Sequence, residues 1–247
     1  MNLTRSLLMI AVLIFSASSG HARTLDDLQA GGVLTCGVAS DHPGFSMRDN
    51  AYRWSGFDVE ICRALAIATI GDGSKVNFVA LAEDEMAVAL QSGEIDVLAR
   101  GVQWDFKEDT TRGLIFVTPT FLAEKPNKDL AVFGPMVRQG DDQWLQVVRW
   151  TVYALLQAEV LGITQANVAE NLNASNSKQS HFLHATPSPD LLGLDLQTDW
   201  PAKIIAGTGN YGEIFERYFG AESQFKQPRA HNRLWRDGGA MIVPAFD

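Results

Sequence analysis

The chain has 247 residues, of which 46% are hydrophobic and 20% charged, and this length suffices for one large or two small globular domains. Acidic residues outnumber basic ones by 29 to 20, and the resulting net charge of −9 argues against a broad surface for nucleic-acid phosphates. Two cysteines exclude a disulfide-dense scaffold and a four-cysteine zinc site.

Residues 1–22 have the order of a secretory signal peptide. Arg5 precedes a compact apolar run from Leu7 to Phe15, and small residues then lead to Ala22. The run is too short for a stable membrane span, and no later stretch approaches the roughly 20 apolar residues of a transmembrane helix. We therefore expect cleavage after Ala22 and export of the mature protein. The alternative, an N-terminal anchor helix, lacks a following stop-transfer pattern.

Helices and strands alternate in the first half of the mature chain. We expect helices over 24–30, 57–70 and 83–92, and strands over 33–38, 76–81 and 95–99. This order predicts a parallel sheet with right-handed crossovers. Ligands of such sheets bind outside the carboxyl ends of the strands, which places a site at residues 39–45 and 100–109.

The second half is predicted to be mostly helical. We expect helices over 141–161, 164–172, 199–206 and 210–219, and a polar loop over 171–180. Residues 207–212 match the dinucleotide pattern G-x-G-x-x-G, but a helix and not a strand precedes them, so we expect a turn and no cofactor. His181 and His184 have no third ligand nearby in sequence and are expected to be a solvated loop pair.

Export places the two cysteines in an oxidising compartment, which bears on their role. Cys36 lies in a predicted strand, and Cys62 lies on the helix that we expect to pack over it. An oxidising compartment allows such a pair to form a disulfide. Two buried, reduced thiols are the alternative, because free cysteine is common in cores.

Seven segments carry a resemblance to a known family. Two are general: residues 54–66 (WSGFDVEICRALA) and 89–100 (ALQSGEIDVLAR). Five are more specific: residues 138–144, 148–150, 158–168, 209–217 and 234–239. They resemble the periplasmic amino-acid-binding proteins, and in particular the general L-amino-acid-binding subunits of polar amino-acid ABC importers. The resemblance covers residues 24–117 and 134–244.

The resemblance implies a type II periplasmic-binding-protein fold of two α/β lobes that close on one amino acid. The family delivers this amino acid to a membrane permease driven by an ATPase. A bidentate arginine suits the ligand's carboxylate, and an acidic side chain suits its ammonium group.

The hinge-like residues 115–117 and the return segment 134–138 are separated by too few residues to form a second lobe, because one βαβ unit needs about 30 residues. We expect a first α/β lobe over 23–117, a short bridge over 118–133, and a return segment with the helical remainder of that lobe over 134–247. The acidic partner of the ammonium group would then be missing.

The expected binding residues also depart from the family. Glu108 stands at the position of the carboxylate-binding arginine, and Val102 and Asp105 replace hydroxyl residues. Arg100 or Arg112 is expected to substitute, although Arg112 could instead pair with Glu108. The ligand-binding candidates are Phe45, Trp54, Arg100, Gly101, Gln103, Trp104 and Arg112.

The sequence therefore predicts the solute-binding component of an amino-acid importer. The alternative is a degenerate, one-lobed remnant that binds no solute. No enzyme is expected, because no histidine or second base is seen beside Glu108. Loss of a lobe is expected to expose an apolar cleft floor around Phe45 and Trp104, which could drive self-association.

Overall fold

A computed structural model describes residues 24–175, 177–185 and 193–246, so the predicted signal peptide lies outside the described residues. Its centre is a five-stranded sheet with the strand order β4-β1-β5-β9-β6. The strands are β1 (Leu34–Val38), β4 (Val76–Ala80), β5 (Val97–Leu98), β6 (Leu114–Phe116) and β9 (Met136–Arg138).

The expected parallel pairing is confirmed for the three strands predicted in the first half, and β9 makes the whole sheet mixed. β1 runs parallel to β4 and β5, whereas β9 runs antiparallel to both β5 and β6. Strands β1, β4, β5 and β6 therefore all end at one edge, which we name the carboxyl edge. We name the opposite edge, where these strands begin, the amino edge.

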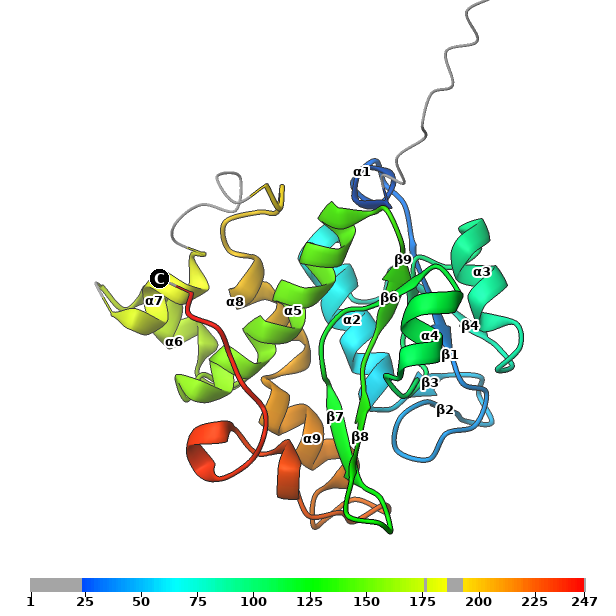
Figure 1. The fold of residues 1–247 in the computed structure, drawn as a ribbon. Helices are drawn as coiled ribbons and strands as arrows, with labels where there is room; N and C mark the ends of the chain where they lie inside the picture. The colour runs from blue at the N-terminus through cyan, green and yellow to red at the C-terminus, as the bar shows by residue number, and fades with distance from the viewer. Residues whose placement is uncertain (1–23, 176, 186–192, 247) are drawn as a thin grey trace, which may run out of the picture.

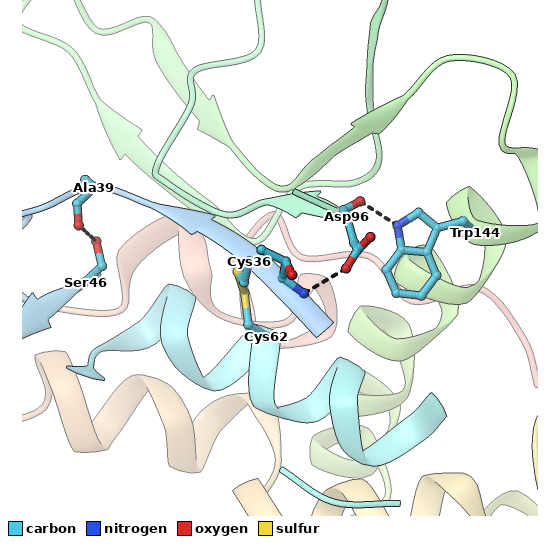
Figure 2. Close-up of a disulfide and its surroundings, with 7 residues drawn as sticks. Cys36, Ala39, Ser46, Cys62, Asp96 and Trp144 are labelled. Atoms are coloured by element: carbon cyan, nitrogen blue, oxygen red, sulfur yellow. Dashed lines mark hydrogen bonds between the residues drawn. A yellow bond between two sulfur atoms is a disulfide. The ribbon is translucent and has the colours of Figure 1, made fainter. Parts of the chain in front are cut away.

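Helix α2 (Phe57–Ile70) covers one face of the sheet, with the bounds that its flanking glycines predict. The disulfide between Cys36 and Cys62 joins it to β1, with a Cα–Cα distance of 6.4 Å, so the expected disulfide is present (Figure 2). α3 (Met86–Ser92) packs on a separate cluster that includes Leu90, Ile95 and Leu98. α1 (Thr24–Gln29) precedes the sheet, and α4 (Phe106–Thr111) joins β5 to β6.

The C-terminal helices share the core of α2. They are α5 (Asp142–Val160), α6 (Val168–Asn173), α7 (Lys178–Leu183), α8 (Trp200–Thr208) and α9 (Tyr211–Phe219). Leu65 of α2, Val148 of α5, Ile204 of α8 and Phe215 of α9 belong to one buried cluster. Figure 1 shows α2 between the sheet and these helices. Both halves of the chain thus contribute to this one buried cluster.

Two local predictions in this half were wrong. The expected loop over 171–180 contains the end of α6 and the start of α7, because the Ser177 side chain caps α7 by accepting a hydrogen bond from the Ser180 N–H. His181 consequently lies within α7 and His184 caps its C-terminus, although both side chains are exposed as expected. The G-x-G-x-x-G segment is confirmed as a turn between α8 and α9, where Asn210 and Glu213 form a capping box.

Residues 118–133 form a hairpin that the sequence did not predict. β7 (Phe121–Glu124) pairs antiparallel with β8 (Leu130–Phe133). The 3-10 helix η2 (Ala230–Asn232) covers the other side of β7, where Asn232 binds the N–H and the carbonyl of Leu122 at 2.7 and 2.9 Å. A second small hairpin pairs β2 (Met47–Arg48) with β3 (Trp54–Ser55), and η3 (Trp235–Asp237) follows η2. Within the described ranges, no helix combines the length and apolarity that crossing a membrane requires.

Candidate functional site

The carboxyl edge carries the two loops that the sequence singles out. After β1 the chain folds into a tight turn in which the His42 N–H donates to the Ser46 carbonyl at 2.8 Å. The N–H groups of Phe45 and Ser46 both donate to the His42 carbonyl at 2.9 Å. The Ser46 hydroxyl donates to the Ala39 carbonyl at 3.1 Å, which ties the turn to the end of β1 (Figure 2). The turn is thus a rigid platform.

His42 joins the two loops. Its ring stacks on Phe45, with the ring centroids 4.4 Å apart. On the second loop, Gly101 has a φ of +65°, and a side-chain carbon there would lie 2.6 Å from Cε1 of His42. Only glycine suits both this backbone angle and this close approach. Phe45 and Gly101, two of the predicted residues, therefore meet at one histidine.

Asp58 lies beside this junction, in the first turn of α2. Its side chain is buried, its residue is only 5% exposed, and the backbone of Gly101 hydrogen-bonds to its carboxyl group. The second carboxyl oxygen, Oδ2, is buried and has no hydrogen-bond partner among the described residues. Burial raises the pKa of Asp58 to about 7, although the Gly101 hydrogen bond acts in the opposite direction. The site therefore holds a carboxyl group that titrates near neutral pH.

Arg100 supplies the positive charge of the site. Its Nε donates to the Leu81 carbonyl at 3.2 Å, which positions the half-buried guanidinium group at the carboxyl edge. Burial, and after it the charge of Arg100, lower the pKa of His42, whereas Asp41 raises it. Because His42 responds to the charge of Arg100, the two side chains share one electrostatic environment.

Gln103 and Trp104 contact the bridge hairpin. The Trp104 N–H donates to the Val132 carbonyl at 2.7 Å, and Gln103 forms an isolated antiparallel bridge with Phe133. The indole of Trp104 stacks on Phe116 at 4.8 Å and remains 48% exposed. The hairpin therefore lies directly against the loop that follows β5.

Phe45 is more buried than expected, and Trp54 and Arg112 lie away from the His42 junction. Phe45 was expected on an exposed cleft floor, but it is only 8% exposed because Phe121 and Phe219 pack against it. Trp54 lies in β3 and packs near Phe78, at 6.0 Å. Arg112 precedes β6 and so stands at the amino edge, where its carbonyl accepts a hydrogen bond from Gln91.

The three residues that we expect to depart from the family lie on one stretch. Val102 is buried, Asp105 is exposed, and Glu108 belongs to α4. None of these positions supplies a positive charge. Among the described residues, no three His, Cys, Asp or Glu side chains gather where they could hold a metal ion.

Two residues of this arrangement escaped sequence reasoning. Asp58 looks like an ordinary acid in a first helical turn, where the helix dipole favours it, and only its burial under the Gly101 loop makes it unusual. His42 follows a predicted strand at its carboxyl end. That position was the available signal, since the site was expected there.

Comparisons with known proteins identify the family of the chain. Residues 34–162 match the family described as bacterial extracellular solute-binding proteins, family 3. The chain belongs to this family. It is also 33% identical to the general L-amino acid-binding periplasmic protein AapJ of Rhizobium johnstonii, over 95% of this chain and 96% of that protein. The glutamate/glutamine/aspartate/asparagine-binding protein BztA of Rhodobacter capsulatus is 28% identical, with coverages of 96% and 97%.

A solved structure of this family shares the fold. It is an ABC transporter periplasmic binding protein from Brucella ovis with glutathione bound, 32% identical, with a TM-score of 0.85 over 92% of this chain and 100% of that chain. The fold is therefore that of the type II periplasmic binding proteins. The alignment with the Rhizobium protein spans 326 positions, whereas 95% of this chain is about 235 residues, so about 91 positions hold no residue of this chain.

Proposed function

We propose that this protein is the periplasmic amino-acid-binding component of an ABC importer. The observation that carries this proposal is the likeness to a general L-amino-acid-binding protein over 95% of the chain, together with the family match. A periplasmic location and a cleaved signal peptide over residues 1–22 belong to the proposal. So does transfer of the amino acid to a membrane permease with its ATPase. Solute binding is what the family name describes, and we assign the chain no chemical reaction.

We further propose that the bridge hairpin stands where the relatives carry most of a second lobe. Residues 118–133 contain only β7, β8 and their turn, and the alignment leaves about 91 positions without a residue of this chain. One side of the ligand would then face the hairpin and solvent instead of a closing lobe. Water exclusion would be incomplete, and polar contacts to the ligand would contribute less to affinity.

Within this proposal, Arg100 binds the ligand's carboxylate. It stands at the carboxyl edge beside His42 and Gly101, whereas Arg112 stands at the opposite edge of the sheet. The guanidinium group suits a carboxylate because it offers two parallel N–H donors. Phe45 supports the platform from the core, and Trp104, with its exposed indole, provides an apolar wall.

Isothermal titration of residues 23–247 with a panel of L-amino acids tests the proposal. Glutathione joins the panel because the Brucella protein was solved with it. We expect saturable binding of at least one compound, with a dissociation constant between about 10 μM and 1 mM because only one side of the ligand is covered. Circular dichroism must show that the same sample is folded. A folded protein that binds no member of the panel at millimolar concentration contradicts the proposal.

A further inference from the structure

A cavity of about 320 Å³ opens at the end of α5 opposite its N-cap, Asp141. Its apolar wall comes from three separate segments: Val160 and Leu161 at the end of α5, Phe182 of α7, and Phe246 of the C-terminal segment. Figure 1 shows this last segment, in red, ending beside α7. The volume lies within the range of small-molecule pockets in proteins.

Aromatic packing fixes the C-terminal wall of the cavity. The ring of Phe246 meets Trp150 edge-on at 5.0 Å and Phe182 edge-on at 5.1 Å. As far as the structure describes the chain, the backbone of residues 242–246 makes no hydrogen bond to another protein group. The wall is therefore held by its rings, and it can adjust to a bound apolar group without breaking a hydrogen bond.

The polar rim of the cavity carries positive charge. Lys178 and His181 are three residues apart on α7, a spacing that places side chains side by side, and Gln157 adds an amide from α5. Among the described residues, none of these three side chains has a hydrogen bond or an ion pair. Among the residues that the structure describes, no acidic side chain lines the cavity, although the protein carries a net charge of −9.

We propose that this cavity binds a small amphipathic monocarboxylate, a single carboxylate on an alkyl or aryl chain. The ligand's alkyl or aryl chain would lie against Leu161, Phe182 and Phe246, and the hydrophobic effect favours its burial there. The carboxylate would remain at the rim, within reach of Lys178 and His181, where partial solvation keeps the cost of desolvation low. This site is separate from the carboxyl edge and does not depend on amino-acid binding there.

Titration calorimetry with octanoate tests the inference, and two analogues separate its parts. Octanamide keeps the chain but lacks the charge, and butanoate keeps the charge but lacks four methylene groups. We expect both analogues to bind at least tenfold more weakly than octanoate. Equal binding of octanoate and octanamide would overturn the inference, and so would the absence of octanoate binding at millimolar concentration.

Variants locate the site. The double variant Lys178→Met/His181→Gln is expected to weaken octanoate binding at least tenfold, and Leu161→Trp, which fills the cavity, is expected to weaken it by a similar factor. Lys75→Met removes a matched exposed lysine from a turn before β4 and is expected to leave binding unchanged. Thermal melting confirms that each variant is folded. Octanoate binding that survives in both the double variant and Leu161→Trp would show that it binds elsewhere.

Discussion

The two edges of the sheet differ in how completely their buried carboxyl groups are hydrogen-bonded. At the amino edge, Asp141 accepts hydrogen bonds from the N–H and hydroxyl of Thr24, at 3.2 and 2.6 Å, and from the Trp144 N–H at 3.3 Å. Asp96 accepts from the Thr35 N–H at 2.7 Å, and its carbonyl accepts from the Trp144 indole at 2.8 Å (Figure 2). At the carboxyl edge, Asp58 keeps a buried oxygen without a partner.

This difference separates folding from function. A buried polar group that is fully hydrogen-bonded stabilises one conformation, whereas an unpaired one costs free energy and persists where a protein has another use for it. The amino-edge network contains Asp141 and Trp144 from residues 138–144, one of the segments that resemble the amino-acid-binding subunits. The resemblance in residues 138–144 therefore concerns the attachment of the helical half to the sheet. Ligand binding is proposed at the carboxyl edge.

The largest effect is expected from breaking the amino edge. Trp144→Ala removes a side chain that is fully buried between α5 and the sheet, together with its hydrogen bond to Asp96. We expect the free energy of unfolding to fall by about 3–5 kcal/mol, measured by urea denaturation. Trp235→Ala is the matched control, because Trp235 is 71% exposed, and we expect a change below about 0.5 kcal/mol. Equal losses in both variants would contradict the role given to this edge.

The disulfide, which joins the middle of β1 to α2, comes next. Cys36 and Cys62 are 26 residues apart, and cross-linking a loop of this length is expected to stabilise the fold by about 3 kcal/mol through the unfolded chain. Urea denaturation with and without dithiothreitol measures this difference. A thiol reagent verifies the bond: under denaturing conditions, the untreated protein should show no reactive thiol. Unchanged stability after complete reduction would contradict the expectation.

The sequence predicts elements best where local signals define both ends. α2 begins after Gly56 and ends before Gly71, and its predicted bounds are the observed ones. β9 has only three residues, too few for their pattern to indicate a strand direction, so its antiparallel pairing depends on the hairpin that precedes it. The hairpin itself depends on Asn232, about a hundred residues later in the chain.

In the candidate site, too, some features could be predicted from the sequence and others could not. The rule for carboxyl ends of strands correctly places the loops that contain Phe45 and Gly101. The burial of Phe45 could not be predicted, because Phe121 and Phe219 cover it from distant segments. The position of Arg112 follows from the direction of β6, which also requires the whole sheet.

The third effect concerns the unpaired carboxyl group at the carboxyl edge. Asp58 has a folded-state pKa raised by burial to about 7, above its ordinary value of 3.8. The folded protein therefore holds this proton more tightly than the unfolded chain, and stability is lost as the pH rises from about 4 to about 7. Asp58→Asn removes this titration. We expect the stability of the variant relative to the wild type to increase by about 2–3 kcal/mol between pH 4 and pH 8.

Urea denaturation at a series of pH values measures this difference. Asp96→Asn at the amino edge is a comparison variant, because burial also raises the pKa of Asp96 but the Thr35 N–H binds its carboxylate. We expect Asp96→Asn to be destabilising at pH 8, since the amide weakens that hydrogen bond. Because burial raises the pKa of both carboxyl groups, both variants should respond to pH in the same direction, and stability at pH 8 distinguishes them. An Asp96→Asn variant as stable as the wild type at pH 8 would contradict the difference between the two edges.

The smallest effect in free energy is the one that bears directly on binding. Arg100→Gln removes the proposed partner of the ligand's carboxylate, and we expect amino-acid affinity to fall at least tenfold, about 1.4 kcal/mol, in the titration described above. Arg112→Gln removes the same charge from the amino edge and is expected to leave the affinity unchanged. The opposite ranking of the two variants would make Arg112 the carboxylate partner. Arg100→Gln should also raise the pKa of His42, because the charge of Arg100 helps to lower it. An NMR titration of the His42 imidazole measures this shift without any ligand, and an unchanged pKa would show that Arg100 does not face the platform where the ligand is expected to bind.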